Sequence, residues 1–300
     1  MASTEFGTFG DDVTIYGYGT RHTCYSGISA PDSDTVGYWR IGNNKSLTDV
    51  SGNGHTLTAR NGAEYDGTGL EAVSASSKYA DTGADISLVG LTSFTLECWA
   101  QYTGALGASK QSPVSWYLAS SNRIFAWFYD NAGTKTCQIL VRFGGTGATQ
   151  TVILTTAEWA AIEAAPSHME IDVLINGVAS SVVFWLNGKT LTNGSSWTLS
   201  LGAAALGAGT LYVGDGTVGA YVWDGPVDEV RLSSVRRNTA AFDPVRNVAV
   251  EGKIVQPAAI IIASGKKLRV KGMGAWKGMG TYGITNNGVL HTSPYMKLEA

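Results

Sequence analysis

Short runs that alternate apolar and polar residues recur along most of this 300-residue chain, about 8 to 15 residues apart. Because successive side chains of a β-strand point to opposite faces, such a run is typical of a strand with one buried face. Asn-Gly turns at 176–177, 187–188 and 193–194 separate several runs, and glycine supplies the positive φ that tight hairpins need. The runs predict strands over 36–41, 55–60, 94–101, 114–119, 123–130, 136–143, 150–154, 168–175, 182–186, 196–200, 210–214, 219–223 and 227–233.

One segment breaks this pattern. Thr155-Thr-Ala-Glu158 is a capping box and Pro166 ends the Ala-rich run after it, so we predict a helix over 155–165. The composition includes 38 glycines, 9 tryptophans and 13 tyrosines, which favours short strands and excludes a disordered chain. Because strands and loops are irregular in length, we expect an all-β fold, a two-sheet antiparallel sandwich rather than a closed barrel.

The charge is unevenly distributed. Of 21 basic and 24 acidic residues, 251–300 hold seven and two, which leaves 14 and 22 in the first 250. We therefore expect an irregular N-terminal arm over 1–35, the sandwich over 36–245, and a basic C-terminal arm or small β extension over 246–300. No nucleic-acid recognition motif accompanies the basic residues, so we expect no nucleic-acid partner.

The C-terminal arm contains a short repeat, Lys271-Gly-Met-Gly-Ala-Trp276 followed by Lys277-Gly-Met-Gly-Thr-Tyr282. Methionine and aromatic side chains make adaptable contact surfaces, which favours a docking element for a partner subunit. A Gly-rich hairpin with a purely structural role explains the same residues. The docking candidates are Lys266, Lys267, Arg269, Lys271, Met273, Trp276, Lys277, Met279 and Tyr282.

The cysteine count and the lengths of the apolar runs indicate the cellular compartment in which the chain is made. Cys24, Cys98 and Cys137 are too few and too scattered for a disulfide framework or a zinc site. The sequence opens without a charged-then-apolar signal segment, and its longest apolar run, 258–263, is too short to cross a bilayer. We expect synthesis in a reducing cytoplasm and no membrane partner.

Four motifs, in order along the chain, carry a family resemblance. They are Tyr38-Trp39 with the turn Asp49-Val-Ser-Gly-Asn-Gly54, then Leu91-Thr-Ser-Phe-Thr-Leu-Glu-Cys-Trp99, Phe184-Trp-Leu-Asn-Gly-Lys189 and Trp223-Asp-Gly-Pro-Val-Asp228-Glu-Val-Arg-Leu232. Over 36–243 the chain resembles the laminin-G-like branch of the concanavalin A-like lectin and glucanase domains, which implies a jelly-roll sandwich. The stretch 228–244 is similar to versions of this module in bacteriophage structural proteins. The helix at 155–165 and the basic tail depart from the family pattern.

The resemblance also implies a structural calcium ion near the Ser-Gly-Asn-Gly turn. Asp49, Asn53 and Asp228 stand at the matching positions. Calcium takes about six to eight oxygen ligands, many of them from loops. The alternative is that Asp49 and Asn53 cap the turn through their side chains.

Two further motifs bear on catalysis and glycan binding. Glu170-Ile-Asp172 resembles part of the Glu-x-Asp-x-x-Glu strand of laminarinase-type glucanases, but apolar residues stand where the last glutamate belongs. Retaining hydrolysis needs two carboxyl groups about 5 Å apart, so we expect no catalysis. Alternation places Glu170 and Asp172 on the face away from the core. Trp223 and Asp224 are the glycan-binding candidates, and core packing is expected for the strand aromatics Trp116, Tyr117, Trp127 and Tyr129.

Together these features predict a non-enzymatic virion structural protein of the bacteriophage type, made in the host cytoplasm. Its terminal arms would attach it to a capsid or tail and to sister subunits, with a trimer expected, and its lectin-like sandwich would face outward. The exposed sandwich would either decorate the particle or contact a host surface glycan. The alternatives are a free carbohydrate-binding module, for which long arms have no use, and a glycoside hydrolase, which the missing carboxylate disfavours.

Overall fold

The computed structural model describes residues 31–65, 67–83, 86–201, 208–242 and 244, together with the backbone of four strands at 13–16, 259–262, 282–286 and 289–293. The chain divides into two compact units. One unit is formed by Ala30–Arg246, and the other by Met1–Ser29 with Asn247–Ala300.

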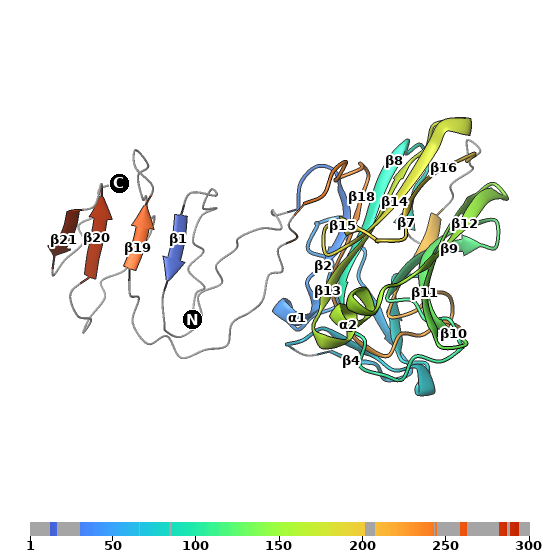
Figure 1. Ribbon diagram of the computed structural model, residues 1–300, viewed down its shortest axis with the longest axis horizontal. Coiled ribbons are helices and arrows are strands. Elements are labelled where there is room, and N and C mark those ends of the chain that lie inside the picture. Colours follow the sequence, from blue (N-terminus) through green and yellow to red (C-terminus); the bar gives the residue numbers. More distant parts are fainter. Residues whose placement is uncertain are drawn as a thin grey trace. The chain divides into compact units, whose positions relative to one another are not determined.

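The larger unit is a two-sheet antiparallel sandwich, which confirms the predicted fold class (Figure 1). In the first sheet the strand order is β12-β11-β10-β9-β17-β6-β3, with β7 paired to β17. The bounds are β3 (Thr58–Arg60), β6 (Tyr79–Asp81), β7 (Ile86–Ser87), β9 (Val114–Ala119), β10 (Asn122–Asn131), β11 (Thr134–Phe143), β12 (Thr146–Ile153) and β17 (Ala208–Val213).

The second sheet follows the order β15-β14-β13-β8-β18-β5-β4, with β16 paired to β14 and β2 paired to β18. Its strands are β2 (Thr35–Trp39), β4 (Glu64–Tyr65), β5 (Leu70–Ala72), β8 (Ser93–Ala100), β13 (Ser167–Leu174), β14 (Ser180–Leu186), β15 (Lys189–Thr190), β16 (Ser196–Leu199) and β18 (Gly225–Ser233). Because the first strand, β2, pairs with the last, β18, the two ends of the sandwich lie side by side.

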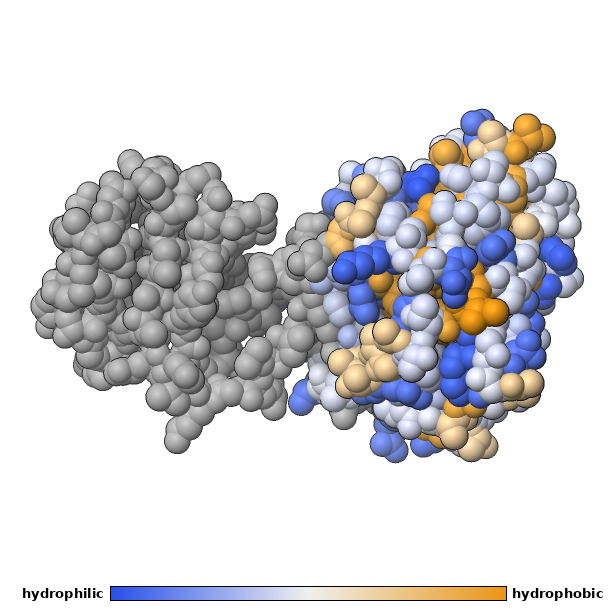
Figure 2. All heavy atoms as spheres, viewed as in Figure 1, coloured by the Kyte–Doolittle hydropathy of each residue, from blue (hydrophilic) through white to orange (hydrophobic). Residues whose placement is uncertain are grey.

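The core lies between the sheets and is built by the apolar half of each alternating strand. Phe128 of β10 meets Phe184 of β14 across the interior, with ring centroids 6.3 Å apart, and Trp116 of β9 is fully buried. Burying a side chain of this size contributes roughly 1.5–3 kcal/mol. Figure 2 shows polar and apolar residues interspersed on the face of the sandwich in view.

Most predicted strands form close to their expected bounds, and β9 matches to the residue. The predicted strand over 219–223 is an exception. This segment is a loop, and the N–H groups of Gly219 and Tyr221 donate to the buried carboxylate of Asp215. Because the Asp215 side chain accepts hydrogen bonds from these backbone N–H groups, they do not require a partner on a neighbouring strand.

The predicted helix forms as α2 (Thr156–Ala164). The Thr155 hydroxyl accepts from the N–H of Glu158 at 3.2 Å, and the Glu158 carboxylate accepts from the N–H of Thr155 at 2.7 Å. Trp159 and Ile162 are buried, which fixes the helix to the sandwich. The remaining helical turns are α1 (Ile41–Asn44), η1 (Ser74–Ser76) and η2 (Gly177–Ala179).

The smaller unit contains one sheet in the order β1-β19-β20-β21. Its strands are β1 (Val13–Tyr16), β19 (Ala259–Ile262), β20 (Tyr282–Asn286) and β21 (Val289–Ser293). β1 pairs antiparallel with β19, and β19 pairs parallel with β20. The two ends of the chain, which the sequence suggested as separate arms, thus contribute to one sheet.

Candidate functional site

Asp224, a predicted glycan-binding residue, lies just before β18 and joins three loops. Its carboxylate accepts from the N–H and the hydroxyl of Ser74, at 2.7 and 2.6 Å, and from Nε2 of Gln111 at 3.2 Å. The chain packs closely here, because a Cβ on Gly104 would lie 2.5 Å from the Cβ of Asp224. Asp224 is therefore a half-buried anchor that fixes the relative positions of these loops.

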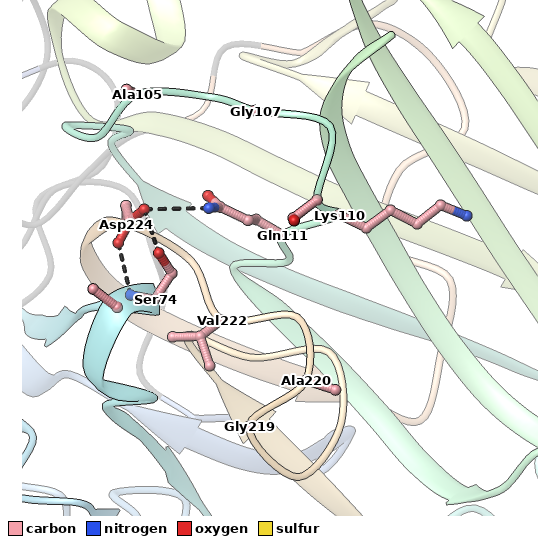
Figure 3. Close-up of a pocket in the computed structure, with 11 residues that line it drawn as sticks. Ser74, Ala105, Gly107, Lys110, Gln111, Gly219, Ala220, Val222 and Asp224 are labelled. Carbon is pink, nitrogen blue, oxygen red and sulfur yellow. Dashed lines mark hydrogen bonds between the residues drawn. The ribbon is translucent and has the colours of Figure 1, made fainter.

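A pocket of about 350 Å³ lies beside this anchor (Figure 3). Its size is within the range of small-molecule sites, roughly 300–1,000 Å³. Small and polar residues form most of its wall, namely Ser74, Ala75, Ala105, Gly107, Ser109, Lys110, Gln111, Gly219, Ala220, Val222 and Asp224. Figure 3 shows Ser74, Gln111 and Asp224 converging on one side of the pocket, whereas the side chain of Lys110 runs away from them.

A row of aromatic rings lies on the outer face of the first sheet, and we call Tyr117, Phe125, Trp127 and Tyr221 the aromatic row. Successive ring centroids are 6.4, 4.7 and 5.2 Å apart. The row forms a cluster separate from the main core. The expectation of core packing is thus confirmed for Trp116 in the main core and for Trp127 in this second cluster, and Tyr117 is partly buried against both clusters.

Lys110 connects the pocket to the aromatic row. Its Nζ lies 4.2 Å from the centre of the Trp127 ring and donates to Oε1 of Gln138. Burial lowers the pKa of Lys110, and the charge of Arg123 lowers it further. The pocket and the row together therefore offer a carboxylate, amide and hydroxyl groups, an ammonium group and the partly exposed rings of Tyr117 and Tyr221.

The prediction that Trp223 offers its ring to a sugar is wrong in this structure, because the side chain is 0% exposed. The ring packs edge-on against Tyr102 and Phe128, and its Nε1 donates to the backbone carbonyl of Gln101 at 2.9 Å. The residue follows a loop signal in the sequence, but its indole fills the sandwich interior. Of the predicted pair, only Asp224 lines the pocket.

The residues implied for calcium already have protein partners. Both oxygens of Asp49 accept hydrogen bonds, from the N–H groups of Tyr38, Ser51 and His55 and from the Ser51 hydroxyl. The Asn53 amide donates to the carbonyls of Thr35 and Val36.

Asp228 accepts from the N–H groups of Gly42 and Glu229, so it contacts the start of α1. Calcium needs many free oxygens, whereas N–H donors face both carboxylates. The donor set of Asp49, Asn53 and Asp228 does not fit a calcium ion in this arrangement, and calcium binding remains a prediction from the resemblance.

The predicted docking residues of the C-terminal arm lie outside the described residues. They are Lys266, Lys267, Arg269, Lys271, Met273, Trp276, Lys277 and Met279, and for Tyr282 only the backbone is described, as the first residue of β20. Docking through this arm remains a prediction.

The carboxylates of Glu170 and Asp172 lie on the face of β13 away from the core, as alternation predicts, yet both are buried. Register places Glu170 directly opposite Glu97 of β8. Oxygens of these two glutamates and a ring nitrogen of His168 lie within 4.8 Å of one another. The structure thus supplies a second carboxylate that the search along one strand did not find.

Protonation differs between the two glutamates. Burial, and then the charges of Glu97 and Asp172, raise the pKa of Glu170 to about 10. Burial also acts to raise the pKa of Glu97, but the hydrogen bond with His168 and the charge of Arg231 outweigh it and lower that pKa to about 2. Glu97 is therefore ionised and paired with Arg231, whereas Glu170 holds a proton.

A segment that follows β18, residues 234–242, covers these acids, and we call it the covering segment. Nδ2 of Asn238 donates to both oxygens of Glu170, at 2.8 and 3.0 Å. The ring of Phe242 packs edge-on against His168 and Trp185, each 5.7 Å away between centroids. The acidic cluster is thus closed to ligands, and the pocket beside Asp224 is the better candidate for a binding site.

Sequence reasoning missed Ser74, Gln111 and Tyr221, which sit in irregular segments without a recognisable motif. It also missed the pairing of Glu97 with Arg231, although both lie in predicted strands. Alternation along the strand was the signal that could have found this pair, because it places both Glu97 and Arg231 on the outer face of their strands.

In the part of the chain that the structure describes, no helix has the length and apolar content needed to span a membrane.

No family model matches this sequence, and no curated protein matches it. Solved structures do match. The full-length tailspike protein 2 of an Escherichia coli O157:H7 bacteriophage aligns over 79% of this chain and 30% of its own, at 12% identity and a TM-score of 0.43. Trypanosoma rangeli sialidase in complex with sialic acid aligns over 70% and 32%, at 18% identity and a TM-score of 0.46. The binding domain of Paraclostridial Mosquitocidal Protein 1 aligns over 68% and 50%, at 13% identity and a TM-score of 0.36.

The chain spans at most half the length of these three proteins. Likenesses of this degree support no inference about activity.

Proposed function

We propose that this chain is a non-enzymatic structural protein of a bacteriophage particle whose sandwich binds a glycan. The observation that carries the proposal is the pocket beside Asp224, which adjoins the aromatic row at Lys110. Sugars present many hydroxyl groups and apolar ring faces, so their sites combine a few fixed polar groups with aromatic surface. Asp224, Ser74 and Gln111 supply the polar groups.

Attachment to the particle is proposed for the smaller unit. It gathers both ends of the chain, and its C-terminal segment carries the excess of basic residues. The resemblance of 228–244 to phage modules also supports a capsid or tail partner, and sister subunits in a trimer complete this proposal. A free carbohydrate-binding module is the second candidate, since the pocket alone would suffice for it.

The non-enzymatic part of the proposal is supported by the burial of Glu97, Glu170 and Asp172. Asn238 and Phe242 of the covering segment occupy the space that a substrate would need above Glu170 and His168. Turnover of a β-glucan that is lost on Glu170→Gln substitution would overturn this part.

A glycan array tests the binding site. Ala220 is exposed and lines the pocket, so Ala220→Trp fills the pocket without removing a side-chain hydrogen bond. We expect the full chain to bind a subset of the glycans and Ala220→Trp to lose that binding, because its indole occupies the space of a sugar ring.

Ala157→Trp on the exposed face of α2 is the matched control, and we expect it to bind like the wild type. Circular dichroism checks that both variants are folded. Failure of the folded wild type to bind any glycan would overturn the proposal, as would unchanged binding by Ala220→Trp.

A further inference from the structure

Two arginines face each other on the outer face of the first sheet. In the register of β10 and β11, Arg123 lies directly opposite Arg142, and the two are half-buried. Like charges directly opposite each other destabilise a sheet. Among the residues that the structure describes, no Asp or Glu pairs with either guanidinium group. The fold therefore keeps a repulsive pair for which it offers no internal counter-charge.

Lys110 adds a third cation to this face. Its ammonium group lies over Trp127, and the guanidinium group of Arg123 lies over Phe125, 5.5 Å from the ring centre. Phe125 and Trp127 are adjacent in the aromatic row. The row is thus a rigid platform that holds two cations in place, which lowers the entropy lost when an anion binds them.

The four strands under this surface contain almost no acidic residues. In β9, β10, β11 and β12 the single acid is Asp130, which pairs with Lys135 and by alternation points to the opposite face from Trp127. Hydroxyl groups of Thr149 and Thr151 are exposed on the cationic side. We call this surface, with Lys110, Arg123, Arg142 and the aromatic row, the cationic face.

We infer that the cationic face binds an anionic polysaccharide, an inference that rests on the proposed glycan-binding function and names its ligand class. Anions complement the three cations, and the partly exposed rings of Tyr117 and Tyr221 offer surface to sugar rings. Arg123 and Arg142 lie opposite each other beside Phe125, and Lys110 lies over Trp127, the next ring of the row. A polymer with repeated charges can contact all three cations at once.

The experiment measures retention of the full chain on immobilised polymers. Polygalacturonate carries carboxylates, dextran sulfate carries sulfates, dextran is neutral, and polyglutamate is an anion without sugar. We expect at least one acidic polysaccharide to bind about tenfold or more tightly than dextran, with affinity that falls as salt rises. The carboxylate and sulfate columns identify which anion the face prefers.

Arg123→Gln and Arg142→Gln test the residues. Loss of one charged contact corresponds to roughly a tenfold weaker affinity. Each substitution also removes the like-charge repulsion, so we expect both variants to fold and to melt no lower than the wild type. Lys189→Gln, exposed on β15 of the other sheet, removes the same charge as a control and should bind like the wild type.

Equal retention on dextran and on the acidic polysaccharides would overturn the inference but leave the proposed glycan binding in place. Polyglutamate binding as tight as that of the polysaccharides would overturn it, because charge alone would then suffice. An equal loss in Lys189→Gln would overturn it as well. If none of the three polysaccharides binds, the inference fails, and the glycan array decides the proposed function separately.

Discussion

At the scale of single residues, neighbours decide the chemistry of each carboxylate. Glu97 and Glu170 are paired across two strands and are equally deep, yet one is ionised and the other protonated. Arg231 and His168 stabilise the charge of Glu97. Glu170 faces two other acids, and its main partner outside them is the neutral Asn238 amide. Where no cation offsets its charge, a buried carboxyl group has a lower free energy in the protonated form than in the ionised form.

Glu170→Gln mimics this protonated carboxyl. The pKa of Glu170 is raised from about 4.5 to about 10, so the folded chain holds a proton that the unfolded chain releases across this range. Its contribution to stability is present below the unfolded pKa and declines as pH rises. We expect the wild-type Tm to fall more than that of Glu170→Gln between about pH 5 and about pH 9. Thermal unfolding at several pH values measures the difference.

Glu163→Gln is the control, since Glu163 is exposed on α2, and its profile should follow that of the wild type. Parallel profiles for wild type and Glu170→Gln would mean that Glu170 is ionised in the folded protein.

At the scale of elements, a residue that forms a local turn can also be required for a tertiary contact. Asn187 and Gly188 have the positive φ values of a tight hairpin turn, 50° and 71°. A Cβ on Gly188 would lie 1.9 Å from the carbonyl oxygen of Phe242, so the same glycine lets the covering segment dock. The turn signal therefore locates the hairpin, and the docking is an additional constraint on it.

The capping box of α2 is also a local signal with a measurable effect. Thr155→Ala removes the hydroxyl that accepts from the Glu158 N–H, and loss of such a cap costs about 1 kcal/mol of unfolding free energy. Chemical denaturation measures this value. Thr156→Ala in the first turn removes an exposed threonine outside the box and should cost less. Equal losses in the two variants would contradict a capping role for Thr155.

At the scale of the whole molecule, the first and last segments of the sandwich along the chain are held together. The Arg237 guanidinium group donates to both oxygens of Asp32, at 2.8 and 2.9 Å, and this lowers the pKa of Asp32 well below its usual range. β2 and β18 pair next to this contact. The N-terminal and C-terminal ends of the sandwich are thus in contact with each other, and the chain continues from both ends into the smaller unit.

Removal of residues 251–300 tests whether the smaller unit attaches the protein to particles while the sandwich binds the glycan. This deletion takes away β19, β20 and β21, but it leaves every strand of the sandwich intact. We expect the truncated protein to lose incorporation into particles, to keep glycan binding, and to retain the melting transition of the sandwich. Co-sedimentation with particles and the glycan array measure the first two. Assembly of the truncated protein on particles would contradict attachment through this segment.

The local structure of the sandwich was largely predictable from short stretches of sequence. Alternation located most of the longer strands, the capping box located α2, and Asn-Gly located the hairpin at Asn187, because each signal depends on residues within a few positions of one another. The short strands β4, β5, β6, β7 and β15 were not predicted. Alternation also gave the face of Glu170 and Asp172. Asp224 was found as a candidate, although its role as a loop anchor was not.

The contacts between distant residues, in contrast, depend on how the strands pair and how the two sheets pack. Strand register brought Glu97 to Glu170 and Arg123 to Arg142, the packing of the two sheets buried Trp223, and the covering segment closed the acidic cluster. These pairings join positions that are far apart along the chain. They follow from the burial of whole faces and from the pairing of distant strands, which no short stretch of sequence encodes.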